Sequence, residues 1–244
     1  MKALKHALLY NIFCCWMVTA IGGVTARHIM VYRDRTDTDR SFALFWLFAS
    51  ALWFSSGLRL LFHGLGWYPM DRITFYVVQI FVMIHVLPGA LHTVLKITAK
   101  RLFLVVVMSC IVFSSALFGF FILYDGVTTL SYSDWGSEYA ISNRAFLCVI
   151  PSFLVLVIGN IFDIVRKLVC WRILKTEPLE HTMASVAIII YVLAGTVDLK
   201  GYDAGWSLLI ERAVYLVAAL ISYTGYIWDS DSAMIEDTVE RSNF

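Results

Sequence analysis

Residues 57–79 read GLRLLFHGLGWYPMDRITFYVVQ, and the rest of the chain can be interpreted outward from this stretch. It places four polar side chains, Arg59, His63, Asp71 and Arg72, at the junction of two otherwise apolar segments. Charged groups are costly inside a lipid bilayer, so a cluster of this kind needs partners, water or a place near the membrane surface. The stretch is therefore where we expect one membrane span to end and the next to begin.

The composition of the whole chain supports this interpretation. The protein has 244 residues, of which 60% are hydrophobic and 15% charged, and its mean hydropathy is +0.76. Soluble domains contain about half apolar and about a quarter charged residues. The apolar runs have the length of about 20 residues that a helix needs to cross a bilayer, and the alternating segments of a β-barrel are absent. The sequence therefore predicts an all-α integral membrane protein, and the net charge of +1 gives no reason to expect nucleic-acid binding.

Apolar windows bounded by charged residues predict a single domain of seven helices. The expected spans are 7–32, 41–63, 72–97, 102–124, 145–170, 178–199 and 206–228. The first apolar run is longer than the core of a secretory signal, so we interpret it as a span. The long loop 125–144 is expected to fold over one mouth of the bundle, and residues 229–244 form an acidic tail. The five cysteines form no CxxC pair and are expected to be small buried hydrophobic residues.

Basic residues in the short loops predict the orientation. Most lysines and arginines lie in the first, third and fifth connections, which the positive-inside rule assigns to the cytoplasm. The N-terminus is then expected outside and the C-terminus inside, in a plasma or inner membrane. We expect contact with the lipid bilayer and, beyond it, a second copy of the chain or a membrane or cytoplasmic protein partner.

A weak internal repeat links the opening stretch to the C-terminal part of the chain. In the opening stretch, a Gly-Trp pair at 66–67 is followed by an acidic–basic pair, Asp71-Arg72. Near the C-terminus, a Gly-Trp pair at 205–206 is likewise followed by an acidic–basic pair, Glu211-Arg212. This pattern predicts two three-helix units, 7–97 and 145–228, joined by the linker helix 102–124. Chance recurrence of residues that anchor helix ends in the interface is the alternative.

We expect an outer network in which Arg59 meets Glu211 and Arg72 meets Asp198. The alternative is that these side chains extend to the lipid headgroups and only anchor the helix ends. Together with polar groups deeper in the spans they define a predicted pathway or gate. Its residues are Arg59, Asp71, Arg72, Gln79, His85, Asp198, Glu211, Arg212, Tyr215 and Ser222.

Histidines on the third span open a further alternative. His85 and His92 share one helical face, with Pro88 between them. Haem b would need two histidines at equal depth, which only His28 and His92 provide, and a metal site could combine His28, His92 and Asp163. For Asp163, pairing with Arg166 and Lys167 one turn away is the simpler explanation. No lysine lies within the seventh span, so a retinal Schiff base has no attachment point there.

These features predict a small transporter or channel with a protonatable pathway between the two three-helix units. The alternative is a non-transporting seven-helix sensor or the membrane subunit of a larger complex. A haem- or metal-bearing membrane redox subunit is the third hypothesis. No GxSxG, HExxH, Walker or Rossmann pattern is present, so the sequence favours a non-enzymatic role and leaves an intramembrane enzyme open as an alternative.

Overall fold

The computed structural model describes residues 6–32, 36–98, 100–174, 179–200 and 206–242. Side chains within these ranges are described except at 32, 170–174, 179–181, 200, 206 and 227–242. In this part of the chain, seven helices are long and apolar enough to cross a membrane, which confirms the predicted membrane helix bundle. The helices are α1 (His6–Tyr32), α2 (Asp37–Gly64), α3 (Tyr68–Ile97), α4 (Arg101–Tyr124), α5 (Asn143–Leu174), α6 (Leu179–Lys200) and α7 (Trp206–Ser242).

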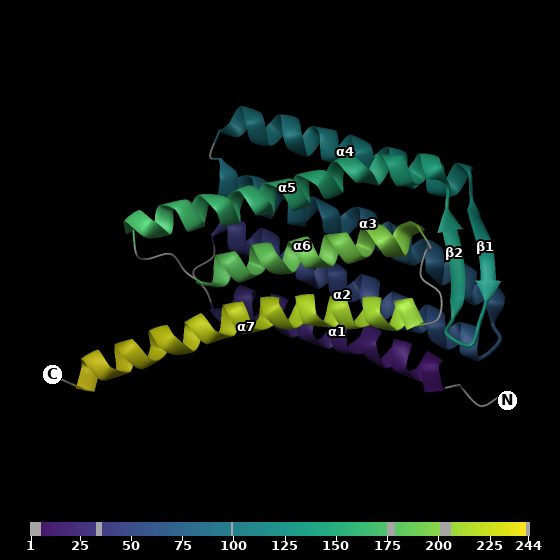
Figure 1. Ribbon diagram of the computed structural model, residues 1–244, viewed down its shortest axis with the longest axis horizontal. Helices are drawn as coiled ribbons and strands as arrows, with labels where there is room; N and C mark the ends of the chain where they lie inside the picture. Colours follow the sequence, from purple (N-terminus) through teal and green to yellow (C-terminus); the bar gives the residue numbers. More distant parts are fainter. Residues whose placement is uncertain (1–5, 33–35, 99, 175–178, 201–205, 243–244) are drawn as a thin grey trace.

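The helices lie side by side along the long axis of the molecule, and a hairpin of two strands covers one end (Figure 1). We call this the hairpin end, and the opposite end, where α7 continues to Ser242, the tail end. Helix α7 extends beyond the predicted limit at residue 228. Helix α4 lies at the edge of the bundle, and its only buried residues are Ile111, Ser114, Phe118 and Ile122.

The opening stretch of the sequence forms the end of α2, a tight turn and the start of α3. Gly66 adopts a positive φ of 76°, which glycine tolerates without strain, and lets the chain reverse between the two helices. Pro69 lies in the first turn of α3, where its missing N–H breaks no hydrogen bond. Gly57 is needed for packing, because a Cβ atom there would lie 2.4 Å from Trp16 Nε1 of α1.

The loop 125–144 folds over the end of the bundle as an antiparallel hairpin of β1 (Val127–Tyr132) and β2 (Ser137–Ile141). Val127 pairs with Ile141 at its base, and a bulge lies between Thr129 and Ser131. The hairpin is tied to the helices by side-chain hydrogen bonds. Asn11 Nδ2 of α1 donates to the Trp135 carbonyl at 3.0 Å, and His63 Nε2 of α2 donates to the Ser133 carbonyl at 2.9 Å.

The second half of the predicted repeat depends on Gly205 and the side chain of Trp206, which lie outside the described residues. The division into units 7–97 and 145–228 therefore stays a prediction. The direction of the chain across the membrane likewise stays an expectation from the loop charges.

Candidate functional site

A cavity of about 90 Å³ lies in the hairpin-end half of the bundle. It is bounded by α2, α3, α5, α6 and α7 and by strand β2. Its polar lining consists of Ser56, Arg59, Gln79, His85, Ser137, Glu138, Asp198 and Arg212. Its aromatic lining consists of Trp53, Phe75, Tyr139, Phe153, Tyr191 and Tyr215. An enclosed apolar pocket with a few convergent polar groups is the usual form of a small-molecule site.

Strand β2 closes the cavity at the hairpin end through a buried carboxylate. Asp71 of α3 is fully buried and accepts hydrogen bonds from Ser137 Oγ and Tyr139 Oη, each at 2.9 Å. Burial and the adjacent Asp71 carboxylate raise the pKa of the Tyr139 phenol well above its ordinary value. The phenol therefore stays protonated and continues to donate to Asp71 at physiological pH.

Arg59 of α2 reaches the same strand from the other side. Its Nη1 donates to the Ser137 carbonyl oxygen at 3.1 Å. The guanidinium carbon lies 5.5 Å from the ring centroid of Phe75 and 5.7 Å from that of Tyr139, within cation–π range. Arg59 is thus held by the hairpin and two aromatic faces at the cavity wall.

Arg212 of α7 is the second buried guanidinium of the cavity. Its Nη1 lies 3.4 Å from Asp198 Oδ2 of α6 and 3.9 Å from Glu211 Oε1. The guanidinium carbon lies 5.0 Å from the Trp53 ring of α2. Arg212 therefore joins three helices around the cavity.

An aromatic layer forms the floor of the cavity, toward the middle of the bundle. His85 Nδ1 donates to the Phe81 carbonyl at 2.9 Å, and the His85 ring packs 5.8 Å from that of Tyr191. Trp53 Nε1 donates to Tyr191 Oη at 2.9 Å. Phe45 packs against the rings of both His85 and Tyr191. Beyond the layer, fully buried rings continue the packing; they include Phe42, Trp46 and Tyr226.

Two polar atoms of the cavity wall have no hydrogen-bond partner among the described residues. Gln79 of α3 is 3% exposed, and its Oε1 atom accepts no hydrogen bond from the described residues. Arg212 Nε is in the same condition. Buried polar atoms are nearly always satisfied by protein, water or ligand, so Gln79 Oε1 and Arg212 Nε are two positions on the cavity wall where water or a bound group could complete the hydrogen bonding.

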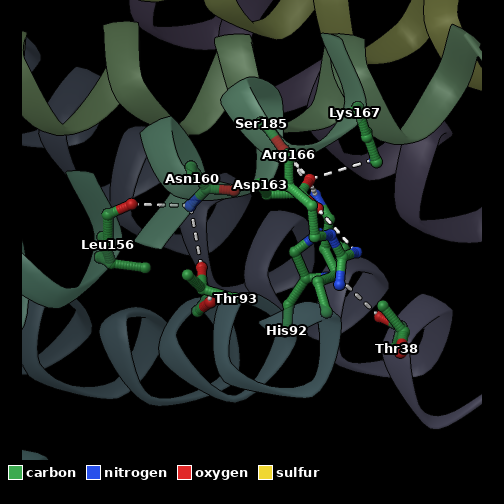
Figure 2. Close-up of polar contacts among 11 residues, drawn as sticks. Thr38, His92, Thr93, Leu156, Asn160, Asp163, Arg166, Lys167 and Ser185 are labelled. Atoms are coloured by element: carbon green, nitrogen blue, oxygen red, sulfur yellow. Dashed lines mark hydrogen bonds and ion pairs between the residues drawn. The ribbon is translucent and has the colours of Figure 1, made fainter. Parts of the chain in front are cut away.

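A second buried polar cluster lies toward the tail end, and Figure 2 shows it. Asp163 of α5 is the centre: its carboxylate lies 2.9 Å from Lys96 Nζ of α3 and 3.1 Å from Lys167 Nζ. Ser185 of α6 donates to it at 2.9 Å, and the more exposed Arg166 lies 3.4 Å away. Asn160, one turn before, donates to Thr93 Oγ1 of α3 at 2.9 Å (Figure 2). These contacts fasten α3, α5 and α6 together.

Most residues of the predicted pathway gather at the cavity, while the pairing between them differs from the prediction. Arg59, Gln79, His85, Asp198, Arg212 and Tyr215 line it. Asp71 does not line the cavity but contacts Ser137 and Tyr139 of strand β2, which form its roof. Glu211 contacts the Arg212 side chain. Arg59 donates to Ser137, and Arg72 Nη2 donates to the Val127 carbonyl at 3.4 Å. The predicted partner of Arg72, Asp198, instead pairs with Arg212.

Ser222 lies elsewhere: it is fully buried and accepts a hydrogen bond from Trp46 Nε1 at 3.0 Å, beyond the aromatic layer. The set His28, His92 and Asp163 also fails as a metal site. No three metal-ligating side chains converge within the described part of the chain. Asp163 is surrounded by Lys96 and Lys167, whose positive charges disfavour a cation, and His92 Nδ1 donates to the Thr38 carbonyl at 2.9 Å.

The sequence interpretation missed several cavity residues, namely Trp53, Ser137, Tyr139 and Tyr191. The hairpin carries two of them, and its β-branched and aromatic residues are the signal that could have identified strands in the loop. Comparisons of the chain with models of protein families, with curated proteins and with solved structures find no significant match. The fold and the site thus define a seven-helix membrane protein with a roofed cavity in one half of the bundle.

Proposed function

We propose that the protein is a seven-helix membrane sensor that binds a small ligand in the cavity and passes its occupancy to the tail end through α7. The observation that carries this proposal is the position of the cavity. It lies under the hairpin in one half of the bundle, and the aromatic layer around His85 and Tyr191 separates it from the other half.

This arrangement favours a binding site over an open pore. A pore would need polar or dewettable space that continues past the floor. Below the floor the side chains of Phe42, Phe45 and Trp46 are fully buried, and the Asp163 cluster follows. A ligand that enters from the hairpin end would therefore stop at the floor.

Helix α7 offers a direct connection between the cavity and the tail end. Arg212 and Tyr215 of α7 line the cavity. The helix contains 37 residues, which corresponds to about 55 Å at 1.5 Å per residue. It is thus longer than the roughly 30 Å of the hydrocarbon core. With the orientation expected from the loop charges, the cavity would open to the outside and α7 would end in the cytoplasm, where a protein partner could contact it.

Hydrogen exchange of α7 tests the proposal. Replacing Arg212 by Met breaks the contact with Asp198 at the cavity, so we expect the amide protection of residues 227–242 to change at least threefold. Arg40→Met, which removes an exposed pair with Asp37 on α2, is the matched control and should leave that protection unchanged. Unchanged protection in the Arg212 variant, or rapid dissipation of a K⁺ or pH gradient by the purified protein in liposomes, would overturn the sensor proposal.

A small transporter is the second candidate, and two prolines favour it. Pro88 of α3 and Pro151 of α5 each interrupt the hydrogen bonding of a helix that borders the cavity, and such sites can act as hinges. A transporter would rock these helices to open the cavity alternately to each side. Solute flux in proteoliposomes that is lost in Pro88→Ala and in the combined Arg59→Ala, His85→Ala and Glu211→Gln variant would establish it. Flux insensitive to all these changes would remove it.

A further inference from the structure

The chemistry of the cavity wall restricts what the ligand can be, and Gln79 is the starting point. Its carboxamide is buried on the cavity wall and makes no hydrogen bond to the described residues. A carboxamide presents a donor and an acceptor side by side in one plane. Its best complement is a second edge with an adjacent acceptor and donor, as in an amide, a lactam or a nucleobase, which glutamine side chains pair with through two hydrogen bonds.

The aromatic residues that line the same cavity as Gln79 favour a flat ligand. Trp53, Tyr191 and Tyr215 form a contiguous group of rings, with centroid separations of 4.4 Å between Trp53 and Tyr215 and 5.1 Å between Tyr191 and Tyr215. Aromatic faces favour stacked or edge-on contact with another planar group.

The charges of the lining favour an uncharged ligand. Two guanidinium groups, Arg59 and Arg212, face two carboxylates, Asp198 and Glu138. Asp198 lies 3.4 Å from Arg212, and Glu138 accepts a hydrogen bond from Ser131 at 2.6 Å. Among these four lining residues the formal charges balance, and the buried carboxylates of Asp71 and Glu211 lie behind them, so the cavity has no excess positive charge for an anionic ligand to neutralise. The unpartnered Arg212 Nε can still donate to a carbonyl oxygen.

We propose that the cavity binds a small, uncharged, planar molecule with an amide-like edge, and that Gln79 pairs with that edge. Aromatic amides and free nucleobases are the chemical class. This inference rests on the proposed function in one respect, since it takes the cavity as a ligand site. It makes no use of the connection through α7.

Calorimetric titration of the purified full-length chain in detergent tests the ligand class. The probes are nicotinamide and uracil, which share the edge but differ in ring. Their matched controls are N,N-dimethylnicotinamide and 1,3-dimethyluracil, which keep the ring and the carbonyl groups but lose the N–H donors. We expect saturable binding of at least one probe, and binding at least tenfold weaker for its methylated control.

Variants of Gln79 test the role of the carboxamide. Gln79→Leu should weaken binding of the probe at least tenfold, while its melting temperature should equal or exceed that of the unmodified protein. Gln79→Glu should also weaken binding, because a carboxylate cannot donate a hydrogen bond. Ile80→Leu, the neighbouring residue at 50% exposure, is the control and should bind as the unmodified protein does. Equal binding by the Gln79→Leu variant would overturn the assignment of Gln79.

The remaining outcomes separate this inference from the proposed function. Binding of benzoate or glycine betaine, lost in Arg59→Met or Arg212→Met, with no binding of nicotinamide or uracil, would overturn the ligand class and leave the cavity as a site. Binding of a probe without any change in the hydrogen exchange of α7 would overturn the sensor and support the ligand class. No binding of any of these probes at millimolar concentration would overturn the inference.

Discussion

At the tail end, the Asp163 carboxylate is 1% exposed and contacts Lys96, Lys167 and Ser185 from three helices. At the hairpin end, Arg59 and Arg212 are also buried, but they border a cavity of about 90 Å³ whose wall includes the unpartnered carboxamide of Gln79. Both halves carry the cost of buried polar groups. At the tail end, Asp163 is paired with cations and a hydroxyl that hold three helices together, although Asn160 Oδ1, one turn before, has no hydrogen-bond partner among the described residues. At the hairpin end, the buried polar groups border a cavity, and we propose that a bound molecule completes their hydrogen bonding.

The comparison predicts opposite responses to substitution in the two halves, and the largest effect is expected at Asp163. Asp163→Leu leaves Lys96 and Lys167 buried without the shared carboxylate, and breaking such a pair costs about 3–5 kcal/mol. Denaturant unfolding in mixed micelles, followed by tryptophan fluorescence, measures the loss. Asp37→Asn is the control, because Asp37 is 83% exposed and surface substitutions change stability by less than about 0.5 kcal/mol. A loss below about 1 kcal/mol for Asp163→Leu would show that the cluster does not stabilise the tail end.

The hairpin roof should respond less strongly. Tyr139→Phe removes one of the two hydrogen bonds to the buried Asp71, and a bond to a charged group contributes about 1.5–3 kcal/mol. The raised pKa of Tyr139 gives a pH signature. The phenol is protonated in both states below the unfolded-state pKa of about 10, so the bond contributes fully there. Above that pH the phenol ionises in the unfolded state while it stays protonated in the fold, so stability should fall above about pH 10.

The matched change for this roof prediction is Tyr124→Phe, which removes the phenol of a 72% exposed tyrosine at the end of α4. It should leave both the stability and its alkaline decline as they are. If Tyr139→Phe keeps the same decline above pH 10 as the unmodified protein, the phenol of Tyr139 is not the group responsible.

Packing between α3 and α5 at the tail end gives a third test. A Cβ atom on Gly159 would lie 2.4 Å from Thr93 Cγ2, so Gly159→Ala should cost about 1–3 kcal/mol through overpacking. At Gly23 of α1 the nearest atom is Ser50 Oγ at 3.9 Å, so Gly23→Ala should be neutral or slightly stabilising. Thermal unfolding of the two variants distinguishes them. Equal melting temperatures would mean that the tail end is no more tightly packed than the rest.

The difference between the halves also explains what could be predicted from the sequence. The seven helices follow from apolar length alone, because the bilayer requires about 20 apolar residues per span. The contact of Asp163 with Arg166 and Lys167 follows from helical spacing, since residues three and four apart face each other. Local periodicity thus suffices for the spans and for part of the Asp163 cluster.

Contacts between distant elements could not be predicted in the same way. Lys96 reaches Asp163 only because α3 and α5 are rotated toward each other, and no pattern within either segment specifies that rotation. The charged residues near the helix ends predict a contact of Arg59 with Glu211, but this pattern carries no information about the hairpin. Once Ser137 and Tyr139 lie on β2, the hairpin provides a closer partner for both Arg59 and Asp71. The residues of the cavity were largely identifiable as polar groups in apolar spans, whereas its roof and its aromatic floor depend on tertiary packing.

The smallest expected change in the free energy of unfolding is at Gln79. It is expected to be a gain, whereas the substitution at Asp163 is expected to cause a loss. Leucine has a similar size and removes a buried carboxamide that has no hydrogen-bond partner, so Gln79→Leu should raise the free energy of unfolding by up to about 1 kcal/mol. The same variant is expected to lose ligand binding, a gain of stability at the expense of function that is common at binding sites. Thermal unfolding without ligand, beside the Ile80→Leu control, measures the change. A loss of more than about 1 kcal/mol would mean that Gln79 supports the fold as Asp163 does, and the contrast between a half held together by ion pairs and a half proposed to bind a ligand would no longer hold.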